Sequence, residues 1–187
     1  LIEYRAYLKK LKDYDLILLM HSVIGDDCRL IQATAKYFLK RKGKIAVFVG
    51  DECNLVKEKK NILISMNADY ICTYLPLDTG KWLYEDIETA VVLPMPHALN
   101  QRKYYNQEKF RQIDLGFIGS DYLLWLGDVE RKKYLEMIIN YASKNKVKTD
   151  IRISSGNLTG NKWADFLNNM KGVIGTESGT YYQDKNG

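Results

Sequence analysis

The stretch Asp15-Leu16-Ile17-Leu18-Leu19-Met20 decides the fold class, because it is a continuous apolar run after one acidic residue. Such a run predicts a strand that is buried on both faces, which is typical of a parallel sheet. Residues 26–42 follow and are predicted to form a helix. Their apolar residues are spaced as on one helical face, and these are Ile31, Ala35, Phe38 and Leu39. Gly43 comes directly after this helix, where a left-handed capping residue is expected.

The same alternation continues on the carboxyl-terminal side of this helix. Strands are predicted over 44–49, 69–73 and 90–93, and a helix over about 55–66 carries Leu55, Ile62 and Met66. Pro94 and Pro96 end the last of these strands. Strands that alternate with helices indicate βαβ units, so we predict a doubly wound parallel sheet.

Residues 97–111 are polar and without a clear period, and the strand–helix pattern restarts after them. We expect strands over 113–118, 150–153 and 172–175. Asp128 is the expected N-cap of the intervening helix, and the predicted faces of the two helices are Leu135, Ile138, Ile139 and Ala142, then Trp163, Phe166, Leu167 and Met170.

The predicted organisation is therefore two successive α/β domains. The first covers residues 1–100, a linker covers 101–111, and a second domain covers 112–187. The chain begins without an initiator Met and ends on a turn-like sequence, so we expect a first domain that lacks its start and a truncated second domain.

Composition limits the class of protein. The chain of 187 residues is 46% hydrophobic and 27% charged, which is ordinary for a globular protein and excludes a disordered tail. The net charge of +5 divides into +1 for residues 1–100 and +4 for 101–187, too little for the basic face of a nucleic-acid binder. The three cysteines form no CxxC pair and only two histidines are present, which indicates reduced thiols, a cytoplasmic location and no zinc site.

Candidate site residues follow the predicted strands, because ligands of open α/β sheets bind beyond the carboxyl ends of the strands. In the first domain His21 is a candidate general base, and Asp51 and Glu52 compete with it for that role. His97 could contact a ligand in the cleft. For His21 a hydrogen-bonded structural role remains the alternative.

In the second domain Gly119-Ser120 ends a strand before a helix, where a phosphate can approach the backbone. Arg131 is either a solvated helix residue or a ligand of a diphosphate, and Ser155 follows the next strand. The strongest local signal is the segment Thr176, Glu177, Ser178, Gly179 and Thr180. Its carboxylate can accept hydrogen bonds from two sugar hydroxyls and its hydroxyls can hold phosphate oxygens, whereas the alternative is a plain turn.

These residues resemble a known family over about 90–187. Asp114-Leu115-Gly116-Phe117-Ile118-Gly119-Ser120 is similar to the D-x-x-F-x-G-S strand of the bacterial spore-maturation-protein-like glycosyltransferases. Arg131 matches an arginine of that group's next helix. Residues 163–167, 175–180 and 184–187 resemble its G-x-E-S/G-G donor segment.

The resemblance implies a GT-B enzyme with two tandem Rossmann-like domains, the first for the acceptor and the second for the nucleotide-sugar donor. It implies donor contacts at Gly119, Ser120 and residues 177–180. By the same resemblance the mechanism is metal-independent, so no metal or other cofactor is expected.

The expected function is transfer of a sugar from a nucleotide-sugar to a saccharide, lipid or protein acceptor, as in bacterial polysaccharide biosynthesis. No nucleic-acid partner is expected, while peripheral membrane association and the oligomeric state stay open. The alternative is a non-catalytic two-lobed α/β module that closes on a small polar or nucleotide ligand.

Overall fold

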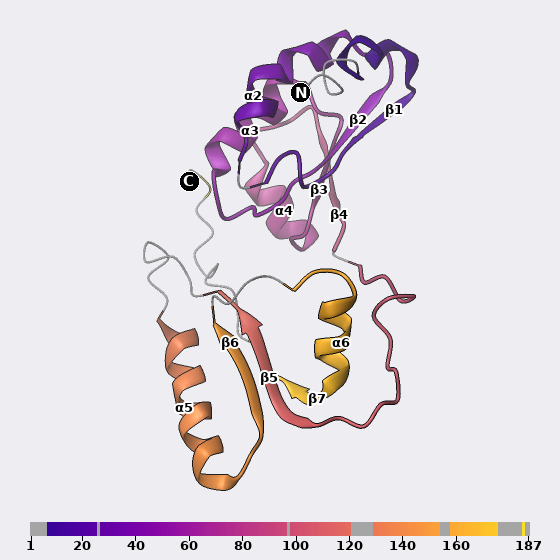
Figure 1. Cartoon of the computed structure of the whole chain (residues 1–187). Coiled ribbons are helices and arrows are strands. Elements are labelled where there is room, and N and C mark those ends of the chain that lie inside the picture. The colour runs from indigo at the N-terminus through magenta and orange to yellow at the C-terminus, as the bar shows by residue number, and fades with distance from the viewer. Residues whose placement is uncertain are drawn as a thin grey trace. The chain divides into compact units, whose positions relative to one another are not determined.

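The computed structural model describes residues 7–25, 27–96, 98–120, 129–153, 158–175 and 185. The chain forms two units, each with its own parallel sheet (Figure 1). The first unit takes in residues up to 97 together with Lys185, and the second covers 98–182. The predicted α/β class with two parallel sheets is confirmed.

In the part of the first unit that the structure describes, four parallel strands lie in the order β1-β2-β3-β4. Its elements, in chain order, are η1 (Leu11–Asp13), β1 (Leu16–Leu19), α2 (Arg29–Thr34), η2 (Ala35–Lys40), β2 (Lys44–Phe48), α3 (Val56–Ser65), β3 (Tyr70–Thr73), α4 (Leu77–Leu83) and β4 (Val91–Pro94). All but η1 and α4 lie where the apolar pattern predicts an ordered element. The strand order follows the chain order, so the helices after β1 connect neighbouring strands.

The helices of this unit pack on one face of the sheet (Figure 1). The core strand residues Ile45, Val47 and Ile71 all lie on that face, since Val47 pairs with Ile71 and Ile45 is two residues before Val47. The helices contribute Ile31, Phe38, Ile62, Leu63 and Leu83 to the same cluster. Right-handed crossovers that always advance in one direction place every helix on the same face, so the predicted double winding is wrong for the described part of this unit.

The opposite face of β1 is open. Leu16 and Leu18 are 53% and 54% exposed, so the prediction of a first strand buried on both faces is wrong. The cause is the topology: β1 is an edge strand, and no described helix packs on the face that these two leucines share. A continuous apolar run in the sequence does not reveal which of its faces is covered.

The helix predicted over 26–42 is two shorter helices. The α-helix α2 gives way to the 3-10 helix η2 at Ala35. Ile31, Ala35 and Phe38 are buried as predicted, but Leu39 is exposed. A 3-10 helix turns about 120° per residue, which rotates Leu39 away from the face that holds Phe38.

Gly43 is required by close packing and not by a left-handed backbone. Among the described glycines only Gly160 has a positive φ, so the predicted capping role of Gly43 is wrong. A Cβ at Gly43 would overlap with the carbonyl group of Asp15, whose oxygen accepts a 2.8 Å hydrogen bond from the Lys44 amide. Glycine therefore lets the turn before β2 lie against the start of β1.

Replacing Gly43 with alanine is expected to lower the free energy of unfolding by about 1–3 kcal/mol, because backbone atoms must move to make room for the methyl group. Urea unfolding followed by circular dichroism measures the change. Gly175→Ala is the matched control, since a Cβ there meets no heavy atom within 4 Å, and its effect should stay within about 0.5 kcal/mol. Equal effects of the two substitutions would contradict the packing role of Gly43.

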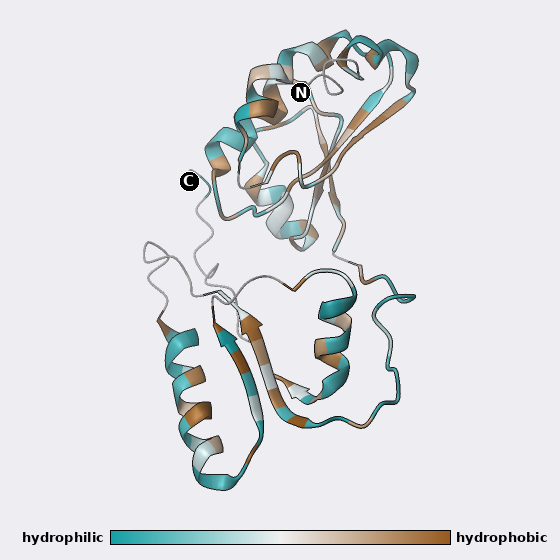
Figure 2. Cartoon of the chain, in the orientation of Figure 1, coloured by the Kyte–Doolittle hydropathy of each residue, from teal (hydrophilic) through white to brown (hydrophobic). Residues whose placement is uncertain are grey.

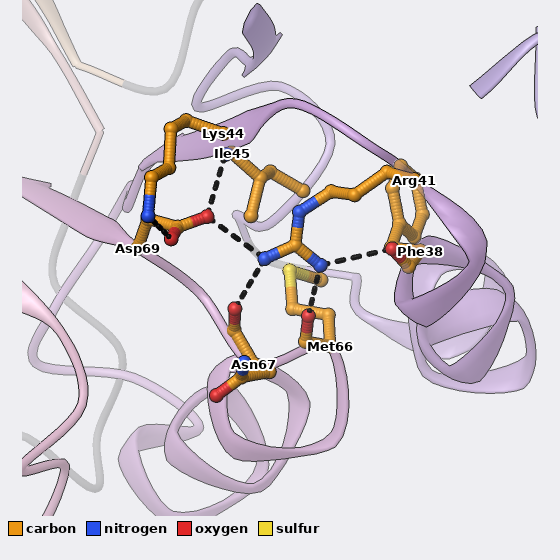
Figure 3. A network of polar contacts seen from close by, with 7 residues as sticks. All are labelled: Phe38, Arg41, Lys44, Ile45, Met66, Asn67 and Asp69. Carbon is orange, nitrogen blue, oxygen red and sulfur yellow. Dashed lines mark hydrogen bonds and ion pairs between the residues drawn. The ribbon is translucent and has the colours of Figure 1, made fainter. Parts of the chain in front are cut away.

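A polar network ties together the amino-terminal ends of β2 and β3 (Figure 3). The Arg41 guanidinium donates to the carbonyls of Phe38 and Met66, each at 2.9 Å, and to Asp69 Oδ2 at 2.8 Å. Asp69 also accepts from the Lys44 ammonium at 2.8 Å and from the Ile45 amide at 2.9 Å. The network fixes the end of η2 and the end of α3 against the sheet.

The described residues of the second unit form three parallel strands in the order β6-β5-β7. Its elements are β5 (Ile113–Gly119), α5 (Glu130–Asn145), β6 (Thr149–Ile153), α6 (Asn161–Asn169) and β7 (Met170–Val173). All five lie where the sequence predicts them, although Met170 begins β7 and does not belong to the helix. On α5, Leu135 and Ala142 are buried, but Ile139 is exposed. Figure 2 shows β5 as largely hydrophobic and both helices as mixed.

The two helices of this unit lie on opposite faces of the sheet. Phe166 of α6 comes within 3.1 Å of the position that a Cβ on Gly116 would occupy. The guanidinium of Arg131 in α5 lies 5.8 Å from the centre of the Phe117 ring. Neighbouring residues of a strand point to opposite faces, so this sheet is doubly wound and its order reverses between β5 and β7.

The segment before β5 is fastened to α6. The buried side chain of Asn168 accepts a 2.9 Å hydrogen bond from the Gln107 amide and donates to the Tyr105 carbonyl at 3.1 Å. Arg111 donates to the Met170 carbonyl at 2.7 Å. Residues 105–111, which lie in the segment predicted as a linker, therefore pack within the second unit.

Candidate functional site

The carboxyl ends of β1 and β2 bring two predicted residues of the first unit close together. His21 follows β1 and Asp51 follows β2. Between them, the position of a Cβ on Gly50 lies 3.3 Å from His21 Cβ, and the Gly50 amide donates to the Ile24 carbonyl at 3.2 Å. Both His21 and Asp51 are exposed at this edge of the sheet. The catalytic roles assigned to them stay predictions.

The loop that carries Asp51 has an unusual backbone that a buried lysine holds in place. Asp51 and Leu55 have φ values of 45° and 53°, in the left-handed region that non-glycine residues seldom adopt. The ammonium of Lys59, a side chain buried in α3, donates to the carbonyls of Gly50 and Asp51, each at 2.7 Å. Such backbone conformations persist where the surroundings fix them, and they cluster at functional sites.

Glu52 is a structural residue and not an accessible base. Its carboxylate is buried and accepts hydrogen bonds from Thr73 Oγ1 at 2.7 and 2.8 Å, from Tyr84 Oη at 2.6 Å and from the Tyr74 amide at 3.1 Å. Burial, and then the charge of Glu52, raise the pKa of Tyr84, which keeps this hydroxyl a donor. The expectation that Glu52 competes as general base is corrected, because these donors and the fold around them shield it from solvent.

In the second unit the carboxyl ends of β5 and β7 are neighbours. Gly119 ends β5 and Ser120 follows it, and the Ile174 amide just after β7 donates to the Gly116 carbonyl at 2.8 Å. In open α/β sheets, the point where the strand order reverses is where ligands bind. The order β6-β5-β7 puts that point at the ends of these two strands.

Arg131 lies in the first turn of α5, as predicted, and reaches the end of β5. Its Nη1 donates to the Ser120 carbonyl at 2.8 Å while its guanidinium lies over the Phe117 ring. The structure therefore brings together three of the predicted donor-site residues: Gly119, Ser120 and Arg131. The interaction of Arg131 with Phe117 is one that spacing in the sequence does not show, since it depends on the crossover that places α5 on this face.

Several predicted residues lie outside the described part of the chain. These are His97, Ser155, Thr176, Glu177, Ser178, Gly179 and Thr180, and also the expected N-cap Asp128. Within the described ranges, no three His, Cys, Asp or Glu side chains are grouped as metal ligands would be. The expectation of chemistry without a metal stays a prediction.

No described helix combines the length and the apolar character that a bilayer-spanning segment needs. Comparisons of the chain with protein-family models, with curated proteins and with solved structures find no match.

Proposed function

We propose that the protein is a glycosyltransferase that moves a sugar from a nucleotide-sugar to a saccharide, lipid or protein acceptor without a metal. In this proposal the two units are Rossmann-like domains of the GT-B type. The second unit binds the donor, and the first binds the acceptor. The proposal combines the resemblance of residues 90–187 with the geometry of the second sheet.

The observation that carries the proposal is the meeting of Gly119, Ser120 and Arg131 at the reversal point of the second sheet. Glycine there lets a phosphate approach the backbone, and the amides at the start of a following helix favour anions. A guanidinium at the same place can stabilise the diphosphate that departs with the nucleotide. Together these features suit a nucleoside diphosphate better than a neutral ligand.

In the first unit we assign the acceptor-side chemistry to the edge that holds His21 and Asp51. A general base must deprotonate the acceptor hydroxyl as it attacks the sugar. An imidazole or a carboxylate at an exposed strand end can do so. Of the two carboxylates predicted there, only Asp51 is exposed, and the carbonyl contacts of Lys59 hold its backbone in place.

Calorimetric titration of the protein with UDP, GDP and dTDP, and with their sugar conjugates, tests this function. We expect one of the three nucleotides to bind and Arg131→Gln to weaken it by about 10- to 100-fold, as loss of a charged hydrogen-bonding group does. The matched control is Lys132→Gln, the exposed neighbour on α5, which should leave the affinity unchanged.

Two outcomes would count against the proposal. If the folded protein binds none of the nucleotides and none of their sugars, the donor site is not present. If a nucleotide-sugar binds but no sugar reaches any acceptor and none is hydrolysed, the protein is the non-catalytic binding module that the sequence also allows.

A further inference from the structure

The exposed surface of η2 alternates lysines with large apolar side chains. Side chains three residues apart in a 3-10 helix lie above one another, so η2 has three rows of side chains, of which the row with Phe38 is buried. A second row holds Lys36 and Leu39, and Leu39 is 55% exposed. The third row holds Tyr37, which is 49% exposed, and Lys40, whose ammonium lies 5.4 Å from the centre of the Tyr37 ring. Each outer row therefore offers one cation and one apolar side chain to solvent.

The segment before β1 enlarges this surface. The helix η1 is in contact with η2, and Leu11 and Phe38 are buried in the same core cluster. Exposed lysines flank Leu11 in the sequence, and one more follows η2. The exposed lysines of the region are Lys9, Lys10, Lys12, Lys36, Lys40 and Lys42. We call these six lysines, together with Tyr37 and Leu39, the η1–η2 surface.

The η1–η2 surface is strongly basic, although residues 1–100 as a whole carry only +1. Residues 28–50 contain no Asp or Glu. The exposed carboxylates of Asp13 and Asp15 follow Lys12 in the chain, toward β1. Within the described ranges, none of the six lysines forms an ion pair with a carboxylate. The lysines outnumber the adjoining acidic groups, so the surface is complementary to an anionic partner.

The arginines of this region are engaged elsewhere. Arg41 is 8% exposed and belongs to the network around Asp69 (Figure 3), and Arg29 pairs with Asp27. Lysine is a compact charge on a flexible apolar stem, whereas arginine is the residue suited to planar, bidentate recognition of bases and phosphates. The cations of the η1–η2 surface are therefore of the kind that a diffuse negative charge attracts.

The apolar side chains favour a membrane over a nucleic acid as the anionic partner. Nucleic-acid binders use aromatic rings as platforms on which bases stack, but the Lys40 ammonium already lies over the Tyr37 ring. The exposed Leu39 has no partner on a phosphate backbone. At a bilayer, tyrosine and leucine enter the interface between headgroups and acyl chains, while lysine stems lie along it with their ammonium groups in water.

We propose that the η1–η2 surface docks the protein on a membrane that carries anionic lipids. The six ammonium groups contact lipid phosphates, and Tyr37 and Leu39 enter the interface. Clusters of about four to eight basic residues are typical of proteins that bind anionic lipids, because each charge adds to the attraction. The inference goes beyond the proposed function, since docking on a membrane needs neither a sugar donor nor an acceptor.

Co-sedimentation of the full chain with lipid vesicles tests the proposal. The vesicles contain phosphatidylcholine and phosphatidylglycerol in a ratio of about 2:1, or phosphatidylcholine alone. We expect binding to the anionic vesicles to be at least about tenfold tighter, and to weaken as salt screens the charges. Lys36→Gln combined with Lys40→Gln should weaken it by about tenfold or more. Lys57→Gln combined with Lys81→Gln is the matched control, because it removes the same charge from exposed positions of the same unit and should bind normally.

A second pair of variants tests the apolar contact. Leu39→Ser should weaken binding to the anionic vesicles by about tenfold, since the serine side chain gains little from leaving water. Leu77→Ser, at a 39% exposed position of α4, is the matched control and should bind normally. Circular dichroism of each variant checks that it is folded. Glycerol 3-phosphate, which has the charge of a headgroup without acyl chains, should not release the protein from the vesicles.

Four results would overturn the proposal. The first is equal binding to both kinds of vesicle, or binding to neither. The second is unchanged affinity when Lys36 and Lys40 are replaced. The third is unchanged affinity in Leu39→Ser or release by glycerol 3-phosphate, either of which would show a site for soluble anions. The fourth is tighter binding to a single-stranded oligonucleotide than to the vesicles in the same salt, which would assign the surface to a nucleic acid.

Discussion

Replacing Arg41 with methionine is expected to lower the free energy of unfolding by about 3–5 kcal/mol, the usual cost of removing one partner from a buried ion pair. The Arg41 side chain is 8% exposed and donates to three carbonyls as well as to Asp69. Methionine fills much of the same space but removes the guanidinium donor from the three carbonyls and leaves Asp69 with only Lys44 and the Ile45 amide as donors. Urea unfolding with linear extrapolation measures the loss.

The matched control for Arg41 is its neighbour in the same network. Lys44 also pairs with Asp69, but its side chain is 65% exposed. Exposed ion pairs contribute about 0–1 kcal/mol, so Lys44→Met should change stability by no more than that. A loss in Lys44→Met as large as in Arg41→Met would show that charge at Asp69, and not the buried guanidinium, holds this edge together.

The same network predicts how stability depends on pH. Burial acts to raise the pKa of Asp69, but the hydrogen bonds from Arg41, Lys44 and the Ile45 amide outweigh it and lower the pKa from 3.8 to about 2. A lowered pKa stabilises the folded state at pH values above 3.8, and this contribution is lost as the pH falls through about 2. In Arg41→Met the free energy of unfolding should fall less between pH 3.8 and about 2, because Asp69 has already lost the hydrogen bond from Arg41 that helps to lower its pKa.

Glu52→Ala is expected to lower the free energy of unfolding by about 3–5 kcal/mol, the second large effect. The substitution removes the acceptor of the Thr73 and Tyr84 hydroxyls and of the Tyr74 amide. Each polar group left unsatisfied in the interior costs about 1–3 kcal/mol. Thermal and urea unfolding measure the loss, and Glu88→Ala, at an exposed position, is the control.

A double-mutant cycle checks that the cost arises at this carboxylate. Tyr84→Phe removes one of the donors, so Glu52→Ala combined with Tyr84→Phe should cost less than the sum of the two single substitutions, by about 1 kcal/mol or more. Additive effects would mean that the hydroxyl and the carboxylate stabilise the fold independently, which would contradict the hydrogen bond between them.

Local patterns in the sequence are sufficient to predict most of the elements. The run at 44–49 becomes β2, and the amphipathic spacing after Glu130 becomes α5. The pattern does not predict which faces of a strand are covered, because that depends on the strand order. The apolar run of β1 is covered on one face only, and no single segment of the sequence reveals the strand order. The helix α4 is missed because Gly80 weakens its helical signal. That glycine is needed for packing, since a Cβ there would lie 2.9 Å from Thr73 Cγ2.

In the candidate site, too, local patterns predict some features and distant contacts decide others. The ends of the strands can be predicted from the sequence, and this places Gly119 and Ser120 at the end of a strand, near Arg131 in the first turn of the next helix. Which carboxylate of the pair Asp51 and Glu52 faces solvent cannot be predicted, because it depends on contacts with Thr73 and Tyr84 in distant segments.

In the proposed function, a nucleoside diphosphate binds where β5 and β7 end. Backbone amide NMR of the ¹⁵N-labelled protein during titration with the nucleotide that binds in calorimetry tests it most directly. We predict that the largest chemical-shift changes occur at Gly119, Ser120 and Gly175, and that Arg131→Gln diminishes them. Changes centred instead on the carboxyl edge of the first sheet, at His21 and Asp51, or no changes at all, would contradict the claim.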